Sequence, residues 1–223
     1  MAQLSDYLLQ VQNDLLHDPN GLLWPQPDVI RYINEARNRV CQDTKALRTI
    51  VQGSQYPSMV FSAGVEFYTP QTFLPAPFGT NLVDIMGISV IVNNERLKLQ
   101  YYPYTTLDAF ARGWVNFQDW PTAWSRIGAG QILIAPVPNQ NYPCDWDISV
   151  IGPPLVLPTD VDTIPVPFQE PVQYYAAYKA KLKPQSQGEA KFFLDLYGDI
   201  LKRCAVAWMT RVVQNPYQRL PGP

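Results

Sequence analysis

Residues 24–44 read WPQPDVIRYINEARNRVCQDT, and the periodicity of this stretch indicates the fold class. Proline is tolerated in the first turn of a helix, because the backbone N–H that it lacks would have no partner there. The sequence therefore predicts a helix from Pro27 to Thr44. Its inner face is expected to carry side chains that recur at helical spacing: Ile30, Ile33, Arg37, Val40 and Cys41. A helix with one apolar face must pack against another element.

A shorter helix is expected before this one, from about Leu4 to His17, with Ser5 or Asp6 as its N-cap. Its apolar side chains share one face: Leu8, Val11, Leu15 and Leu16. The turn sequence DPNG at residues 18–21 stops this helix. Two helices joined by so short a connection predict an antiparallel hairpin.

Two more helices are predicted near the other end of the chain, from Val172 to Lys183 and from Gly188 to Gln214. The longer helix has an apolar stripe at helical spacing: Phe193, Leu196, Tyr197, Ile200, Cys204, Trp208 and Val212. Helices at the two ends of a chain commonly pack around one core. We expect the shared core to include eight side chains: Leu8, Val11, Ile30, Ile33, Tyr178, Phe193, Ile200 and Trp208.

Between residues 57 and 152 the apolar period changes to two, which predicts about seven strands of a meandering antiparallel sheet. The clearest strand is Arg96–Tyr101, where Leu97, Leu99 and Tyr101 are expected to face one side of a half-solvated sheet. A short helix is expected at Thr105 to Arg112.

Short turns are expected to join neighbouring strands of this sheet. The predicted hairpins are residues 59–61 with 65–68 through Ala63-Gly64, residues 88–92 with 96–101 through Asn93-Asn94, and residues 124–127 with 132–134 through Gly128–Gly130. A last strand carries Trp146, Ile148 and Val150.

Residues 153–171 contain six prolines and predict an extended strap, because proline cannot donate into a sheet or lie inside a helix. The sequence as a whole predicts an α+β fold. In this fold the N- and C-terminal helices form an antiparallel bundle, and an antiparallel β domain is inserted between them. The expected boundaries are residues 1–50 with 168–215 for the helical part, 56–157 for the β insertion, 153–171 for the strap and 216–223 for a C-terminal tail.

Charge is unevenly distributed along the chain, although the net charge is only -2. Residues 170–223 carry eight basic and four acidic side chains, whereas residues 51–169 carry four basic and nine acidic ones. This asymmetry suits complementary contacts between neighbouring copies, and an ordinary solvated surface would have the same composition. A broad basic surface that grips nucleic acid is excluded.

The cysteines Cys41, Cys144 and Cys204 are odd in number and far apart, so we expect three core thiols in a reducing compartment. The longest apolar stretch, near Ala205 to Met209, is far shorter than the ~20 residues of a membrane-spanning helix. With no signal-like N-terminus either, we expect a soluble protein that is not exported.

The sequence contains little that indicates catalysis. The single histidine, His17, lies at the end of a predicted helix, where a capping or surface role is expected. Asp145 with Asp147, and Asp160 with Asp162, would share a strand face and could in principle hold a hard cation. Because Asp147 alternates with apolar residues, these acids are interpreted as the solvated side of their strands. We expect no enzyme, no cofactor and no metal.

Several segments follow one another along most of the chain: WPQPDVIRYINEA at 24–36, GVEFYTP at 64–70, WPTAW at 120–124, ILIAPVP at 132–138, the strap ending at 164–167, VQYYAAYKAKLK at 172–183, and a long helix with Phe192 and Phe193. Their order and spacing resemble those of the head-to-tail adaptor proteins of short-tailed bacteriophages, the tail tubular A-like or head completion group. The sequence differs from some members in the long loop between Tyr101 and Pro121 and in its short, proline-bounded C-terminus.

The resemblance implies a structural protein of the virion neck that is assembled in the host cytoplasm. It implies a homo-oligomeric ring, of twelve copies, docked under the portal protein and offering a platform for a downstream tail or nozzle protein. Viral DNA would pass through the lumen without specific binding, which agrees with the low net charge, because tight phosphate contacts need clustered Lys and Arg.

We expect the portal to be contacted by the end of the last helix and the tail after it, Arg211 to Pro223. Prolines forbid helix in the tail, and its side chains offer an aromatic, a charged and an apolar anchor. The expected docking residues are Arg211, Val212, Tyr217, Arg219 and Leu220. A frayed terminus with no partner is the alternative.

A second function is considered because aromatic side chains are abundant in the β insertion. A flat array of Trp114, Trp120, Trp124 and Trp146 would stack on sugars, as in a β-rich carbohydrate-binding module of a phage tail or cell-surface protein. Aromatic residues are equally enriched in subunit interfaces, and a sugar-binding module has little need of four flanking helices. The interface interpretation is therefore preferred.

Overall fold

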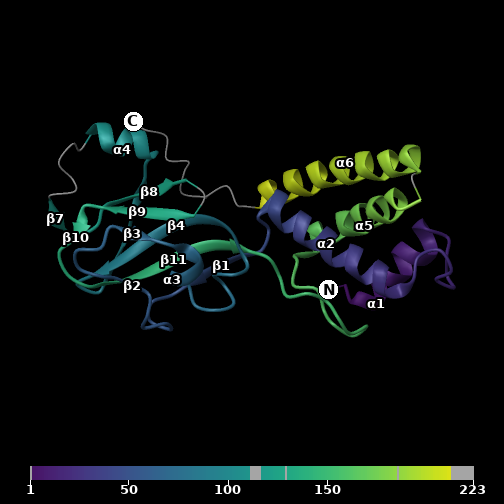
Figure 1. Ribbon diagram of the computed structural model, residues 1–223, viewed down its shortest axis with the longest axis horizontal. Helices are drawn as coiled ribbons and strands as arrows, with labels where there is room; N and C mark the ends of the chain where they lie inside the picture. The colour runs from purple at the N-terminus through teal and green to yellow at the C-terminus, as the bar shows by residue number, and fades with distance from the viewer. Residues whose placement is uncertain (1, 111–116, 129, 185, 212–223) are drawn as a thin grey trace, which may run out of the picture. The chain divides into compact units, whose positions relative to one another are not determined.

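The computed structural model describes residues 2–110, 117–128, 130–184 and 186–211 (Figure 1). The chain forms two compact units. Residues 1–47 and 151–223 belong to the first, the helical unit, and residues 48–150 belong to the second, the sheet unit. The predicted α+β class, with helices from both chain ends packed together and strands between them, is confirmed.

The helical unit is built from elements of both ends of the chain. Its elements are α1 (Leu4–Leu8), the π-helix η1 (Leu9–Leu15), α2 (Gln26–Thr44), the 3₁₀ turn η3 (Val166–Phe168), α5 (Glu170–Leu182) and α6 (Gln187–Arg211). Helix α5 packs against α2, α6 and η1. The first predicted helix is therefore present but widens into a π-helix after Leu8.

The N-cap of α1 corrects the expected one. Gln3, rather than Ser5 or Asp6, caps the helix, and the backbone N–H of Gln3 donates to the Asp6 carboxylate at 2.8 Å. A carboxylate in the first turn accepts from an amide that would otherwise have no helical partner. Asp6 thus caps α1 from a position within the first turn of the helix.

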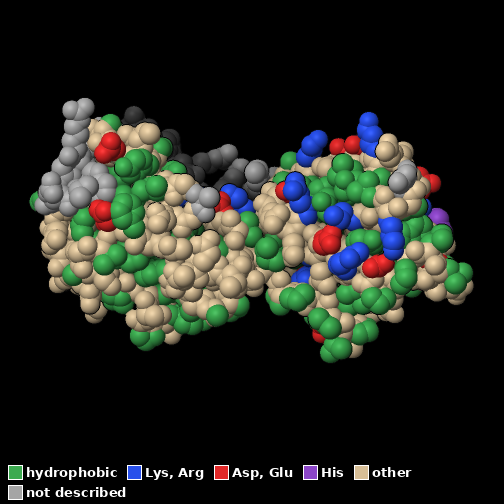
Figure 2. Space-filling view, viewed as in Figure 1, with side chains coloured by type: hydrophobic (Ala, Val, Ile, Leu, Met, Phe, Trp, Pro, Cys, Tyr) green, Lys and Arg blue, Asp and Glu red, His purple; other side chains and the backbone are tan. Residues whose placement is uncertain are grey.

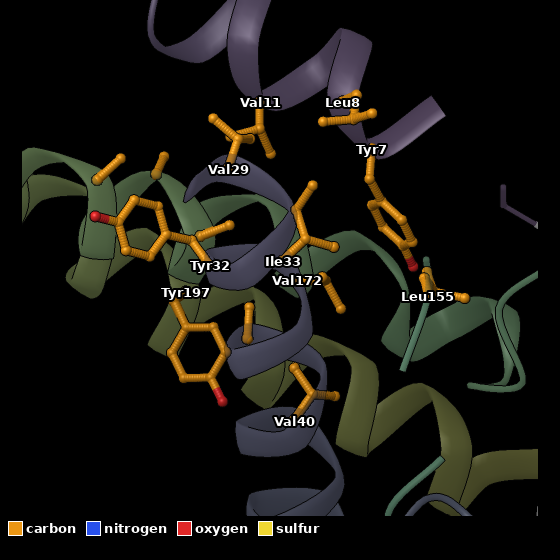
Figure 3. Close-up of a cluster of buried hydrophobic side chains, with 14 of the residues drawn as sticks. Tyr7, Leu8, Val11, Val29, Tyr32, Ile33, Val40, Leu155, Val172 and Tyr197 are labelled. Carbon is orange, nitrogen blue, oxygen red and sulfur yellow. The ribbon is translucent and has the colours of Figure 1, made fainter. Parts of the chain in front are cut away.

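One hydrophobic core joins the two ends of the chain (Figure 3). Leu8, Val11, Ile33 and Ile200 are buried in it, and Ile30 and Phe193 pack against it half-buried, as predicted. Tyr178 was wrongly assigned to this core, since it is half-buried outside the cluster and its ring meets that of Tyr175. The side chain of Trp208 lies outside the described part of the chain.

The stripe predicted for the last helix is confirmed where it is described. Tyr197, Ile200 and Cys204 are buried, and Phe193 and Leu196 are half-buried. The Tyr197 hydroxyl donates to Asp43 of α2 at 2.8 Å. Helix α6 is thereby tied to α2 as well as to α5.

The strap is mainly extended, as predicted, but it turns at residues 157–160 and again at η3, and its last two predicted residues begin α5. It runs beside the N-terminus, where the backbone N–H groups of Leu4 and Ser5 donate to the carbonyls of Asp160 and Pro158, each at 3.0 Å. An isolated bridge pairs Gln3 with Val161. These bonds satisfy backbone groups that a proline-rich segment cannot pair within itself.

The described part of the sheet unit has more strands than the seven or so that were predicted, and they range from 2 residues in β2 to 11 in β4. The strands are β1 (Arg48–Val51), β2 (Val60–Phe61), β3 (Phe67–Tyr68), β4 (Leu82–Val92), β5 (Glu95–Lys98), β6 (Gln100–Tyr101), β7 (Gln118–Asp119), β8 (Ala123–Ile127), β9 (Gln131–Ala135), β10 (Val137–Pro138) and β11 (Tyr142–Val150). Two short helices, α3 (Pro70–Phe73) and α4 (Tyr104–Phe110), accompany them, and α4 occupies the position of the expected short helix.

These strands form three sheets. The first has the order β1-β11-β4-β5 with β2 also on β11, the second has the order β3-β9-β8-β6, and the third pairs β10 with β7. Most pairs are antiparallel, but β6 with β8 and β10 with β7 are parallel. A single antiparallel meander, as the sequence analysis expected, is therefore too simple.

Two of the three predicted hairpins are confirmed. Strands β4 and β5 pair across Asn93 and Asn94, whose φ angles of 51° and 65° suit the tight turn between twisted strands. Strands β8 and β9 pair across Gly128. The third hairpin was wrong, because β2 pairs with β11 whereas β3 pairs with β9.

The segment Arg96–Tyr101 is divided between two sheets rather than forming one strand. The N–H of buried Leu99 donates to Ile88 in the first sheet, and the N–H of Gln100 donates to Thr122 next to the second, both at 2.9 Å. After this crossing, Tyr101 is exposed. The alternation in the sequence thus spans two mostly exposed strands that are joined at a buried residue, Leu99.

Candidate assembly surfaces

A buried ion pair fixes the strap to the helical unit. The Arg37 guanidinium donates from Nε and Nη2 to Asp162 Oδ1 at 3.1 and 2.8 Å, and the two side chains are only 2% and 0% exposed. The Tyr7 hydroxyl donates to Asp162 Oδ2 at 2.7 Å. Burial, and then the charge of Asp162, raise the pKa of Tyr7 above its usual range. Asp162 is thus a core ion-pair partner, and its expected place on a solvated strand was wrong.

The middle of the strap is held by two polar side chains. The Asn34 amide donates to the Leu155 carbonyl at 2.9 Å and accepts from the Leu155 N–H at 2.8 Å. Asp160 accepts from the N–H groups of Val156 and Leu157 at 2.7 and 2.8 Å, which lowers the pKa of its carboxyl. Asp160 is therefore a turn-forming residue. Together with Asn34, it holds the middle of the strap in a defined conformation.

The loop after η1 presents two leucines on a rigid support. Buried Asp18 accepts from the N–H of Leu22 at 2.9 Å, of Leu23 at 2.8 Å and of Trp24 at 2.9 Å. These bonds, led by that from Trp24, lower the pKa of the Asp18 carboxyl. The Trp24 indole donates to the Ala180 carbonyl at 3.0 Å and anchors the loop on α5. Leu22 and Leu23 remain 81% and 69% exposed.

Basic side chains gather on the helical unit, with acidic ones among them (Figure 2). Across α2 and α5 the ion pairs are Lys183–Asp28 at 2.9 Å, Arg31–Asp28 at 3.4 Å, Lys179–Glu35 at 3.0 Å and Arg39–Asp43 at 3.0 Å. The hydrogen bond to Asp28 raises the pKa of Lys183. Exposed pairs of this kind contribute little to stability, but each acid offsets a positive charge that would otherwise attract phosphate.

The C-terminal part of α6 extends beyond its main partner. Helix α6 has 25 residues and α5 has 13, so their lengths are about 37 and 20 Å. The turn η3 contacts α6 as well. Val206 is nevertheless 63% exposed, and Lys202 and Arg203 are exposed before it.

The paired acids of β11 have structural partners in the sheet unit. Asp145 is buried, accepts from the Gly53 N–H at 2.8 Å and pairs with Arg96. Asp147 pairs with Arg48 across β1. The interpretation of Asp145 as a solvated side chain was wrong, because β11 is a central strand that is covered by neighbours over most of its length.

The tryptophans do not form the flat array that a sugar-binding module would need. Trp124 is 3% exposed and Trp146 is fully buried, where its ring meets those of Phe61 and Phe73. Trp120 is exposed, and Trp114 lies outside the described residues. Besides Phe67, the exposed aromatic side chains described in the sheet unit lie between residues 101 and 120: Tyr101, Tyr102, Tyr104, Phe117 and Trp120. We refer to these five as the aromatic surface.

The remaining candidates for chemistry have no reactive setting. His17 is exposed, with a φ of 54°, directly after η1. Cys41, Cys144 and Cys204 are buried free thiols, as predicted. Among the described residues there is no group of three His, Cys, Asp or Glu side chains able to hold a metal ion. Across the same residues, no helix has the length and apolar character needed to cross a membrane.

The five expected portal-docking residues fall at the limit of the described chain. Arg211 is the last residue of α6. Val212, Tyr217, Arg219 and Leu220 lie outside the described residues.

Two compact units, a braced strap and exposed apolar and charged surfaces are features expected of a protein that binds neighbours in an assembly. The family model of the SU10 adaptor protein matches residues 2–217, nearly the whole chain, and this is a family of phage head-tail adaptors. The chain belongs to the SU10 adaptor protein family. It is therefore a structural adaptor of the phage virion and not an enzyme. No curated protein matches the chain.

Proposed function

We propose that this adaptor forms a homo-oligomeric ring of twelve copies between the portal and the tail, around the DNA channel. An adaptor must hold two different neighbours, and the chain has two units with separate cores and separate exposed surfaces. This division, together with the family, is the observation that carries the proposal. A closed ring also needs two unlike, complementary faces on each copy.

The ion pairs of α2 and α5 support passage of DNA without specific binding. Lys179, Lys183 and Arg39 each have an acidic partner within 3.0 Å. Side chains that are already paired release fewer counterions on contact with phosphate, so they bind DNA weakly. A lumen lined in this way would let the genome slide.

We assign portal binding to Arg211, the last residue of α6, and to the tail after it, with Val212, Tyr217, Arg219 and Leu220 as the other contacts. In the sequence, the tail directly follows α6, a helix that packs on α5 and η3. A proline-stiffened segment loses less entropy on ordering than a flexible one. The aromatic surface is assigned to the downstream tail or nozzle protein, because exposed aromatic anchors are typical of binding hot spots.

Mass photometry and negative-stain imaging of the purified protein, with and without portal rings, test the ring. The expected result is a closed ring of twelve copies on the portal. A protein that stays monomeric under both conditions would contradict the proposal.

Deletion of Tyr217–Pro223 tests the portal assignment. The truncated protein should keep its thermal stability, because the apolar stripe of the last helix ends at Val212 in the sequence, and should no longer co-purify with the portal. The matched control is the double substitution Phe117→Ala and Trp120→Ala, which should leave portal binding unchanged and weaken binding of the tail protein. The opposite pattern would move portal docking to the aromatic surface.

A further inference from the structure

The N-terminal end of the helical unit presents an apolar and acidic surface, which we call the N-terminal tip. It comprises the exposed residues Leu9, Asp14, Leu22 and Leu23. No Lys or Arg occurs in residues 2–30. The basic side chains that approach the tip are paired, Lys181 with Glu189 at 2.7 Å and Lys183 with Asp28 at 2.9 Å. The surface charge of the tip is therefore negative.

The tip is built to keep its leucines exposed. The backbone of residues 22–24 is fixed by the buried Asp18 carboxylate, and Gly21 adopts the positive φ of 64° that the turn requires. A side chain at residue 21 would approach Gln12 Nε2 to 3.0 Å. Apolar side chains on a preorganised loop lose little entropy on binding, which is the property of an interface anchor.

The opposite end of the unit carries the opposite charge. No Asp or Glu follows Asp199 in the sequence. Lys202 is 81% exposed and lies 3.8 Å from Asp199, and Arg203 lies next to it before exposed Val206. Glu170 at the start of α5 offsets part of this charge near Cys204. We call Lys202, Arg203 and Val206 the α6 end.

Figure 1 shows the α6 end and the loop after η1 at opposite ends of the helical unit. Both surfaces belong to one unit, so every copy of the chain offers one of each. The tip combines exposed leucines with negative charge, and the α6 end combines exposed Val206 with positive charge, as complementary interfaces require. Unlike patches at opposite ends suit a head-to-tail contact, whereas a twofold contact would place one patch against itself.

We propose that the N-terminal tip of one copy docks on the α6 end of the next copy in the ring. This inference rests on the proposed homo-oligomeric ring and names the surfaces that close it. Leu22 and Leu23 pack around Val206, and Asp14 faces Lys202 and Arg203. The occupant of the tip is thus a second copy of this chain.

Charge reversal with rescue tests the contact. Asp14→Arg alone, and Lys202→Glu with Arg203→Glu, each place like charges across the interface and should reduce ring formation on the portal by about tenfold or more. The triple variant restores opposite charges and should recover rings to within about threefold of the wild type. Rings are counted by mass photometry, and circular dichroism checks that each variant folds.

The matched controls are Lys98→Glu and Asp108→Arg, which change exposed charges of the sheet unit and should leave ring formation unchanged. If the charge-reversal variants of the helical unit form rings as well as the wild type does, the tip contact is overturned but the ring proposal stands. Additive loss in the triple variant would assign these surfaces to another partner and also overturn it. If the wild type forms no rings, both proposals fail.

Discussion

One ion pair of the helical unit and one ion pair of the sheet unit differ sharply in burial. In the helical unit, Arg37 and Asp162 are buried and bring together segments separated by 125 residues. In the sheet unit, Arg48 and Asp147 form a pair at the surface, where the Arg48 side chain is 56% exposed. A buried charge that loses its partner is costly, whereas a surface charge is solvated by water. The helical unit therefore depends on its Arg37–Asp162 pair more than the sheet unit depends on its Arg48–Asp147 pair.

The two units also differ in how many segments of the chain build them. The sheet unit is one continuous segment, residues 48–150, whereas the helical unit combines residues 1–47 with residues from 151 onward. The core of the helical unit can close only after both ends of the chain are present. The N-terminal segment should therefore be indispensable to one unit and dispensable to the other.

Removal of residues 1–46 should have the largest effect. The deletion takes away α1, η1 and α2, and with them about half of the buried side chains of the helical core. Each buried aliphatic side chain contributes about 1.5 to 3 kcal/mol, and the total stability of a domain is only about 5 to 15 kcal/mol. Hydrogen exchange should show α5 and α6 unfolded and the sheet unit still protected. A monomeric fragment with intact C-terminal helices would contradict the shared core.

Substitution of Arg37 by Met should have the next largest effect. It leaves the Asp162 carboxylate buried without its cation and should destabilise the helical unit by about 3 to 5 kcal/mol. The matched control, Arg48→Met, removes the cation of an exposed pair and should cost at most about 1 kcal/mol in the sheet unit. Denaturant-dependent hydrogen exchange reports each unit separately. Equal losses of stability in the two variants would contradict the expected difference between buried and surface ion pairs.

The sequence predicted those elements whose signals are local. Helix α2 begins beside Pro27 because proline suits a first turn, and β4 pairs with β5 because Asn93 and Asn94 tolerate positive φ. The crossing at Leu99 could not be predicted, since an alternating pattern looks the same in one strand as in two. Sheet partners depend on contacts between distant segments, which no local pattern encodes.

The candidate functional residues likewise include some that the sequence indicated and some that it did not. Charge asymmetry along the chain was visible in the sequence, but the roles of Asp162 and Asp18 were not. An aspartate in a proline-rich strap looks solvated until Arg37 and Tyr7 are placed beside it. For Asp18 a signal was present, since Asp before Pro-Asn-Gly commonly caps its own loop. Only the structure shows that Asp18 also holds the backbone of Leu22 and Leu23.

Replacement of Asn34 by Ala should have a smaller effect than the loss of Arg37. It removes both hydrogen bonds to the backbone of Leu155, and the expected cost is about 1 to 3 kcal/mol. Thermal unfolding and proteolysis of the strap provide the measurement. Asn139→Ala in the sheet unit is the control, because the Asn139 side chain accepts one bond, from the Tyr142 hydroxyl. If the two variants lose the same stability, the strap is held by its other contacts instead.

The smallest expected effect is the pH dependence of the N-terminal loop. The pKa of Asp18 is lowered by the N–H groups of Trp24, Leu23 and Leu22, so the charged carboxylate stabilises the folded loop. This stability is fully present above the ordinary aspartate pKa of about 3.9 and is lost as pH falls through the lower folded value. The stability difference between wild type and Asp18→Asn should therefore be constant between about pH 5 and 7 and shrink under more acidic conditions. Asp28 and Asp160 also have lowered pKa values, so only the stability difference between wild type and Asp18→Asn isolates the effect of Asp18. If this difference stays unchanged in acid, the loop does not depend on the charge of Asp18.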